Sequence, residues 1–103
     1  MIRISFVLLS LFAILGLTPA AHAGAEQGGV LAKRWCAACH VVSADQQRAG
    51  GQAPPFAAIG KTPGLDTGRL ALFLLLPHPR MPDMALSRAE AADLAEYIKS
   101  QGK

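Results

Sequence analysis

Apolar residues recur at helical spacing in several separate stretches of the chain. From about Ala25 to Cys39 the small and apolar residues fall on one helical face, whereas Lys33 and Arg34 point away from it. The members of that face are Gly28, Leu31, Ala32, Trp35 and Cys39. We therefore predict a first helix that ends at Cys39, with Trp35 as a core residue packed against a neighbouring helix or against a group bound where the helix ends. We expect Gly28 to permit the close approach of another helix, because glycine otherwise weakens a helix.

A second helix is predicted after Asp66, a residue type that commonly caps helix N-termini. Its inward face comprises Leu70, Phe73 and Leu74, and Pro77 ends it. The segment 70–76 is apolar around nearly its whole circumference, which predicts burial or one face exposed to a partner. It is too short to cross a membrane.

The last helix should begin with a capping box in which Ser87 and Glu90 satisfy each other's backbone amides. Its apolar face comprises Ala91, Leu94, Ala95 and Ile98, with Tyr97 beside them. Gly102 is predicted to end the helix. Between the helices, residues 41–65 show no sustained period and are expected to form an irregular loop, and residues 77–84 form a proline-rich extended loop.

The first 23 residues form a pattern typical of export signals. Arg3 supplies a positive charge, residues 4–17 are apolar, and Ala21-His22-Ala23 is a small-x-small cleavage site. An uncleaved membrane anchor is the alternative, but the apolar stretch is short for a membrane span. We therefore predict cleavage after Ala23, which leaves residues 24–103 as one small periplasmic domain without stable membrane insertion.

Charge contributes little to the interpretation. Loss of Arg3 leaves nine Lys and Arg against seven Asp and Glu, a net charge of +2 on the mature domain. The pI of about 9.2 belongs to the precursor and gives no reason to expect a nucleic-acid interface.

The chemistry is concentrated in a C-x-x-C-H run at residues 36–40. This is the pattern for covalent attachment of one haem c through two thioethers, at Cys36 and Cys39, with His40 as an axial iron ligand. Thiols three residues apart on one helical face can both reach the vinyl groups along one haem edge. Haem would also complete a small core, since ordering about 80 residues costs on the order of 120 kcal/mol. We expect the haem-free mature chain to be largely unfolded.

Other interpretations of the motif are weaker. A thioredoxin-like pair would be expected near a βαβ pattern, which we do not find. A zinc site needs four ligands, and the adjacent Cys39 and His40 cannot easily share one tetrahedron. Chance is disfavoured because Cys36 and Cys39 are the only cysteines and a histidine follows directly. With both cysteines bound to haem, no structural disulfide is expected.

The loop at 77–84 offers the second axial ligand. Its prolines hold the chain taut, so that a side chain can be presented to the iron opposite His40. Met81 is the expected ligand, Met84 and His78 remain alternatives, and one of the two methionines is predicted to fill the core.

A second proline-rich segment, at residues 53–56, has two interpretations. The Pro54 carbonyl can accept a hydrogen bond from the outer nitrogen of His40. The other interpretation is a plain polyproline turn with Phe56 in the core.

In these features the mature chain resembles the small monohaem class I c-type cytochromes, over nearly all of residues 24–103. The shared features are the C-x-x-C-H run, Gly28 eight residues before the first cysteine, Ala53-Pro54-Pro55-Phe56, Met81-Pro82, and a terminal helix with Leu94, Tyr97 and Ile98. The resemblance implies an all-α cytochrome c-like fold of three or more short helices around one haem, attached on the outer side of the bacterial cytoplasmic membrane. It also implies contact between Gly28 and Tyr97, the Pro54 carbonyl on His40, and Met81 as distal ligand. Two positions depart from the family: Ala32 where an aromatic is common, and Ala53 where glycine is common.

The function that these features predict is one-electron transfer between periplasmic or membrane-bound redox proteins. With both axial positions filled, no open site for a substrate remains, so we expect no enzymatic activity. Contacts with partners should be small and transient, and a monomer is the default. The alternatives are a haem-based gas-binding or sensing module and the small cytochrome subunit of a periplasmic dehydrogenase. Candidates for binding the haem propionates are Arg48, Lys61, Arg69 and Arg80.

Overall fold

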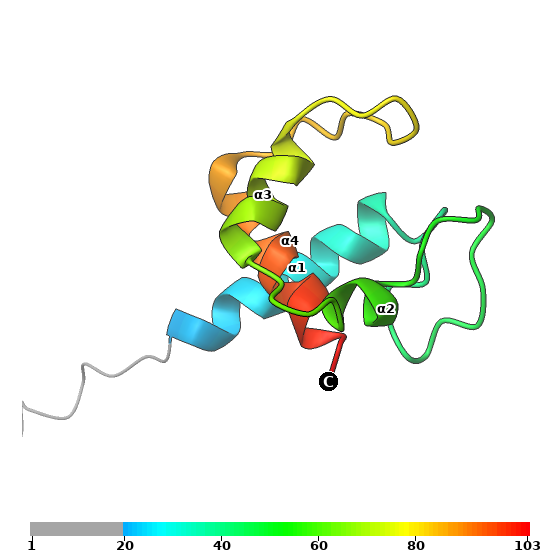
Figure 1. Cartoon of the computed structure of the whole chain (residues 1–103), viewed down its shortest axis with the longest axis horizontal. Helices are drawn as coiled ribbons and strands as arrows, with labels where there is room; N and C mark the ends of the chain where they lie inside the picture. The colour runs from blue at the N-terminus through cyan, green and yellow to red at the C-terminus, as the bar shows by residue number, and fades with distance from the viewer. Residues whose placement is uncertain (1–19) are drawn as a thin grey trace, which may run out of the picture.

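The protein folds as helices joined by long loops (Figure 1). The computed structural model describes residues 20–103, with side chains from residue 24 onward; the export signal predicted for residues 1–23 lies almost wholly outside this range. Within it the chain forms four helices and no strand: α1 Ala20–Trp35, α2 Phe56–Gly60, α3 Thr67–Leu75 and α4 Arg88–Ser100. None of these helices is both long and apolar enough to span a bilayer. The predicted all-α fold of three or more short helices is confirmed.

Helices α1 and α4 cross at Gly28, as predicted. A Cβ atom at this position would lie 2.6 Å from the carbonyl carbon of Asp93 and 2.7 Å from Cβ of Tyr97. Only glycine leaves room for so close an approach of two backbones. The next residue, Gly29, faces the edge of the Tyr97 ring.

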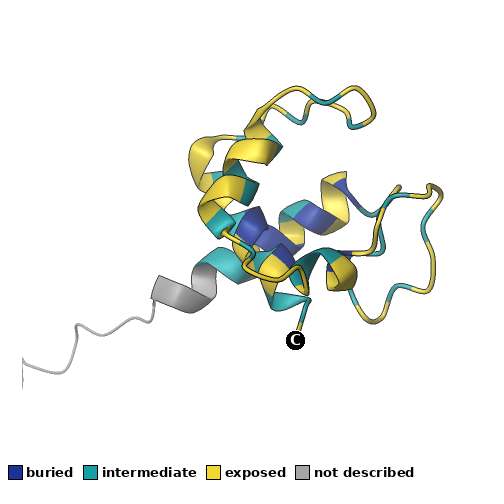
Figure 2. Cartoon of the chain, in the orientation of Figure 1, coloured by how far each residue is buried: buried dark blue, intermediate teal, exposed yellow. Residues whose placement is uncertain are grey.

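The core is small and lies mainly between α1, α2 and α4 (Figure 2). Its buried side chains are Ala32, Cys36, Val42, Phe56, Ala91, Leu94, Ala95 and Ile98. Helix α3 contributes no fully buried residue, although Leu70 and Leu74 pack against the core. Part of its apolar surface must therefore serve something other than the protein core.

The predicted helix starts are confirmed for α3 and α4. The Asp66 carboxylate accepts a hydrogen bond from the Arg69 amide at 3.0 Å. At α4 the Glu90 amide donates to the Ser87 hydroxyl at 3.1 Å, and the Ser87 amide donates to the Glu90 carboxylate at 2.9 Å. Each of these helices therefore has one first-turn amide satisfied by the side chain of its N-cap residue.

The predicted boundaries of the first helix were wrong at both ends. Helix α1 begins at Ala20 instead of Ala25, so the predicted cleavage point falls inside its first turns. It ends at Trp35, before the first cysteine, because the amide of Ala37 turns to the Ala32 carbonyl five residues back. The amides of Cys39 and His40 then share the Cys36 carbonyl, which makes residues 36–40 a compact turn instead of a continuation of the helix.

The prediction that residues 41–65 are irregular throughout was also wrong. The five-residue helix α2 begins directly after Pro55, whose carbonyl accepts from the amides of Ala58 and Ile59. So short a helix carries no periodic signal and is marginal in isolation. Its anchor is Phe56, which is only 2% exposed.

Gly102 follows the end of α4, but it does not end the helix as a glycine cap, as we predicted. The helix ends in a right-handed turn at Gln101, and the positive φ that a glycine stop would need is absent here. A Cβ atom on Gly60 would instead lie 2.6 Å from the amide nitrogen of Gly102. Two glycines thus let the end of α2 touch the end of α4, backbone against backbone.

Candidate functional site

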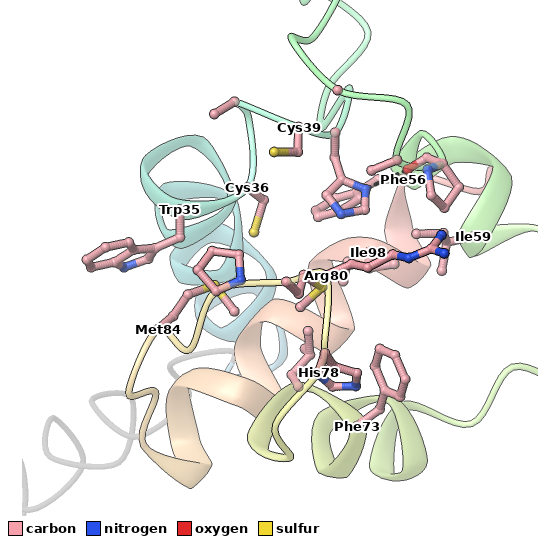
Figure 3. A pocket seen from close by; sticks show the side chains of 18 of the residues that line it. Trp35, Cys36, Cys39, Phe56, Ile59, Phe73, His78, Arg80, Met84 and Ile98 are labelled. Atoms are coloured by element: carbon pink, nitrogen blue, oxygen red, sulfur yellow. Dashed lines mark hydrogen bonds between the residues drawn. The ribbon is translucent and has the colours of Figure 1, made fainter.

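A cavity of about 910 Å³ opens beside the small core. It is lined by the 36–40 turn, residues 51–59, α3 and the 78–84 loop, with Ile98 of α4. Figure 3 shows Cys36 and Cys39 on one side of this space and His78 and Phe73 on the other. A cavity of this volume is at the upper end of what ligand and cofactor sites enclose. Leu70, Phe73 and Leu74 of α3 form part of its wall.

Both cysteine thiols reach the cavity, although they project from a turn and not from the predicted helical face. Cys36 is buried and Cys39 is exposed, and the two do not form a disulfide. Burial, with a smaller contribution from Cys39, raises the pKa of Cys36 to about 11. Cys36 is therefore a neutral thiol at physiological pH in the absence of a covalent partner.

His40 is held by its outer ring nitrogen. Nδ1 lies 2.6 Å from the carbonyl oxygen of Pro54, which can only accept, so the proton is on Nδ1. This is the hydrogen bond that the sequence offered as one of two interpretations of the proline segment. Phe56 packs against the imidazole with ring centroids 5.1 Å apart, so the buried Phe56 side chain of the second interpretation is present as well. The tautomer leaves Nε2 with a free lone pair for a metal ion.

All three candidates for the opposite ligand line the cavity. The side chain of Met84 also packs against the buried core cluster, and the His78 ring lies 3.9 Å from the Phe73 ring, centroid to centroid. Met81 is half-buried and does not belong to the core cluster. This arrangement gives Met84 the core-filling role predicted for one methionine. It favours Met81 as the methionine that is free to bind the metal of a cofactor in the cavity.

Two side chains that line the cavity, Trp35 and Arg80, bear on predictions made from the sequence. Trp35 is 43% exposed and lines the cavity, with the Arg34 guanidinium carbon 4.9 Å from its ring centroid. It is therefore not buried between helices, whereas its place against a group bound in the cavity stays a prediction. Among the four basic residues proposed as propionate partners, Arg80 alone lines the cavity.

Sequence reasoning missed Gln46 altogether. Its side-chain amide hydrogen-bonds to backbone groups of residues 37, 40, 42 and 48, and so ties the 36–40 turn to the loop that follows it. A polar residue in an aperiodic loop carries no signal that could have identified this role.

The donor set fits haem c. Two thiols with C-x-x-C spacing and an imidazole of fixed tautomer border the same cavity as a thioether, and most of the remaining lining is apolar. Among residues 24–103, whose side chains the structure describes, no three His, Cys, Asp or Glu side chains come together as a metal-binding group.

Comparison with known proteins decides the family. No protein-family model matches the chain, and no solved structure does. A curated protein, cytochrome c-552 of Bradyrhizobium diazoefficiens, is 51% identical to it over 78 residues, which are 76% of this chain and 75% of that protein. The chain belongs to the c-type cytochromes. The cofactor of this cytochrome is covalently bound haem c, for which Cys36 and Cys39 have the required spacing, and its role is electron transfer and not enzymatic catalysis.

Proposed function

We propose that this cytochrome is an exported carrier that moves single electrons between periplasmic or membrane-bound redox proteins, with His40 and Met81 as the axial ligands. The observation that carries the proposal is the 2.6 Å hydrogen bond from His40 Nδ1 to the Pro54 carbonyl, at a cavity that Met81 also lines. The hydrogen bond directs the Nε2 lone pair to metal coordination, and a half-buried thioether on a proline-held loop supplies the second position.

Each of these residues has a distinct task. Haem c, when bound, supplies the reversible one-electron couple of its iron. Cys36 and Cys39 hold it covalently, and the Pro54 carbonyl keeps the proton on His40 Nδ1, which increases the basicity of the ligating nitrogen. The neutral thioether of Met81 favours the reduced state relative to a second imidazole, so the reduction potential should be positive for a haem protein.

The proposal also covers export and the choice of partners. The predicted signal segment at residues 1–23 supports delivery to the periplasm, with cleavage after Ala23. A carrier must release its partner after each transfer, so its contacts should be small and short-lived and the protein should be a monomer.

One observation favours a second candidate function. Leu72 of α3 is 57% exposed and Leu76, directly after the helix, is 52% exposed, which is unusual for an apolar segment of a small domain. This face suits a lasting contact, as in the small cytochrome subunit of a periplasmic dehydrogenase. Co-purification with a larger enzyme from the native periplasm would support that function, whereas isolation as a free monomer supports the carrier.

Visible and near-infrared spectra of the mature protein test the ligand assignment. We expect low-spin iron in both oxidation states, a thioether-to-iron charge-transfer band in the ferric form, and no response to carbon monoxide. Prompt gas binding by the wild-type protein would instead support a gas-binding module.

Variants of the two methionines separate their roles. Met81→Ala should abolish the charge-transfer band, admit carbon monoxide and lower the reduction potential. Met84→Ala should keep the band and lower stability by about 2–5 kcal/mol, because its side chain packs on the core. The reverse pattern would transfer the ligand role to Met84, and loss of the band in His78→Ala alone would transfer it to His78.

A further inference from the structure

Gln46 makes more side-chain hydrogen bonds to the backbone than any other side chain in residues 24–103. Its Nε2 donates to the carbonyl oxygens of Ala37 and His40, both at 3.0 Å, and lies 3.2 Å from that of Arg48. Its Oε1 accepts from the Val42 amide at 2.9 Å. The amide has two hydrogens for three acceptors, so one N–H is shared, and both ends of the side chain are in use.

The backbone around His40 depends on these bonds. Other carbonyls of the segment have partners elsewhere: Ala38 accepts from the Gly50 amide at 2.8 Å, and Val41 accepts from the Phe56 amide at 2.9 Å. The carbonyls of Ala37 and His40 receive their hydrogen bonds from Gln46. Without this side chain, two partly buried carbonyls and the Val42 amide would have to find water, or the turn would have to rearrange.

We propose that Gln46 is a positioning residue for the axial histidine. The imidazole is held at Nδ1 by the Pro54 carbonyl. The backbone that carries it is held by Gln46, which hydrogen-bonds to the His40 carbonyl and to the Val42 amide. A ring attached at one point can still tilt as its backbone moves, whereas a ring and backbone held separately cannot. Gln46 thereby keeps the ligand plane the same in both oxidation states. The inference rests on the proposed function, because it requires His40 as an axial ligand.

The test compares haem-loaded Gln46→Ala and Gln46→Glu with Gln47→Ala and Gln47→Glu. The control residue is the adjacent glutamine in sequence, and it is exposed. Gln46→Glu keeps an oxygen that accepts from the Val42 amide, but it replaces the donating nitrogen with a second oxygen. This variant therefore removes the hydrogen bonds to the three carbonyls and keeps the one to Val42. We expect both Gln46 variants to shift the ferric electron paramagnetic resonance g values and the reduction potential, which report ligand orientation, and both Gln47 variants to match the wild type.

The wild-type protein gives a second test that requires no variant to fold. In the ferrous protein, the side-chain amide protons of Gln46 should exchange with solvent at least about tenfold more slowly than those of Gln47. Equal exchange rates would overturn the proposal.

Two further outcomes would also overturn it, and they differ from each other. If the Gln46 variants lose stability but keep wild-type g values and potential, the residue merely supports the fold, and the proposed function stands. If the wild type itself lacks the low-spin signature of histidine and methionine ligation, the proposed function fails first and the positioning role fails with it.

Discussion

The contact between Gly28 and α4 is a sharp test of the fold, and Gly28→Ala is the perturbation. The new Cβ would overlap the Asp93 carbonyl oxygen and lie 2.6 Å from its carbonyl carbon, where ordinary contacts begin at 3.4 Å. The helices must therefore separate by at least about 0.8 Å. The obstructing atoms belong largely to backbone and cannot rotate away. A gap of this size forfeits about a quarter to a half of each dispersion contact across the interface.

The expected magnitude follows from two opposing effects. Overpacking of this kind costs about 3 kcal/mol, the upper part of the usual range, because no flexible side chain can yield. Replacing glycine by alanine within a helix returns about 1 kcal/mol. We therefore expect a net loss of about 2 kcal/mol in the free energy of unfolding, and a melting temperature about 8–16 °C lower for a domain of this size.

Gly29→Ala is the matched control, one residue further along the same helix. Its Cβ would lie 3.0 Å from Cε2 of the Tyr97 ring, a side chain that can shift by a few tenths of an ångström. The helix-propensity gain should offset this contact, so the change should stay within about 1 kcal/mol. The assay is guanidinium unfolding of the ferric holoprotein, followed by circular dichroism at 222 nm. Equal midpoints for the two variants would refute the close backbone crossing.

Three further predictions concern side chains and turns elsewhere in the fold. Tyr97→Phe removes the hydroxyl that donates to the Val42 carbonyl at 2.7 Å, and should cost about 1–2 kcal/mol in denaturant unfolding; an unchanged midpoint would contradict that contact. Ala85 has a φ of 50°, so Ala85→Gly should relieve strain and raise stability by about 1 kcal/mol, and a lower melting temperature would count against it. Hydrogen bonds from the Ser87 backbone and side chain hold the pKa of Glu90 below its ordinary value. A depressed folded-state pKa means that this stabilisation is fully present above the ordinary pKa of 4.5 and is lost as pH falls through the lowered pKa. Glu90→Gln should therefore flatten the acid limb of a stability-against-pH curve.

Much of the site could be predicted because its chemistry is encoded locally. The C-x-x-C-H spacing identifies the cofactor whether residues 36–40 are a helix or a turn, and both thiols reach the cavity despite the wrong helix boundary. The Pro54 carbonyl could be offered as a partner for His40, but the pattern could not decide between that bond and a plain turn. Fourteen residues separate the two, so only the folded loop brings them within 2.6 Å.

The sequence by itself determined the elements whose causes lie within one turn of helix. The caps at Asp66 and Ser87 involve partners three residues away, and the buried face of α4 follows from its periodicity, so both could be derived from the printed chain.

The tertiary structure decided the features that depend on distant partners. Helix α2 forms around Phe56 because its side chain has a core to enter, and Gly102 is glycine because the end of α2 meets it. Met84 rather than Met81 packs against the core. Gln46 donates hydrogen bonds to the carbonyls of Ala37 and His40, in a turn that precedes it in the chain. Such contacts join segments that are distant in the sequence. Their partners come within reach only once the chain has folded, so no local pattern can predict them.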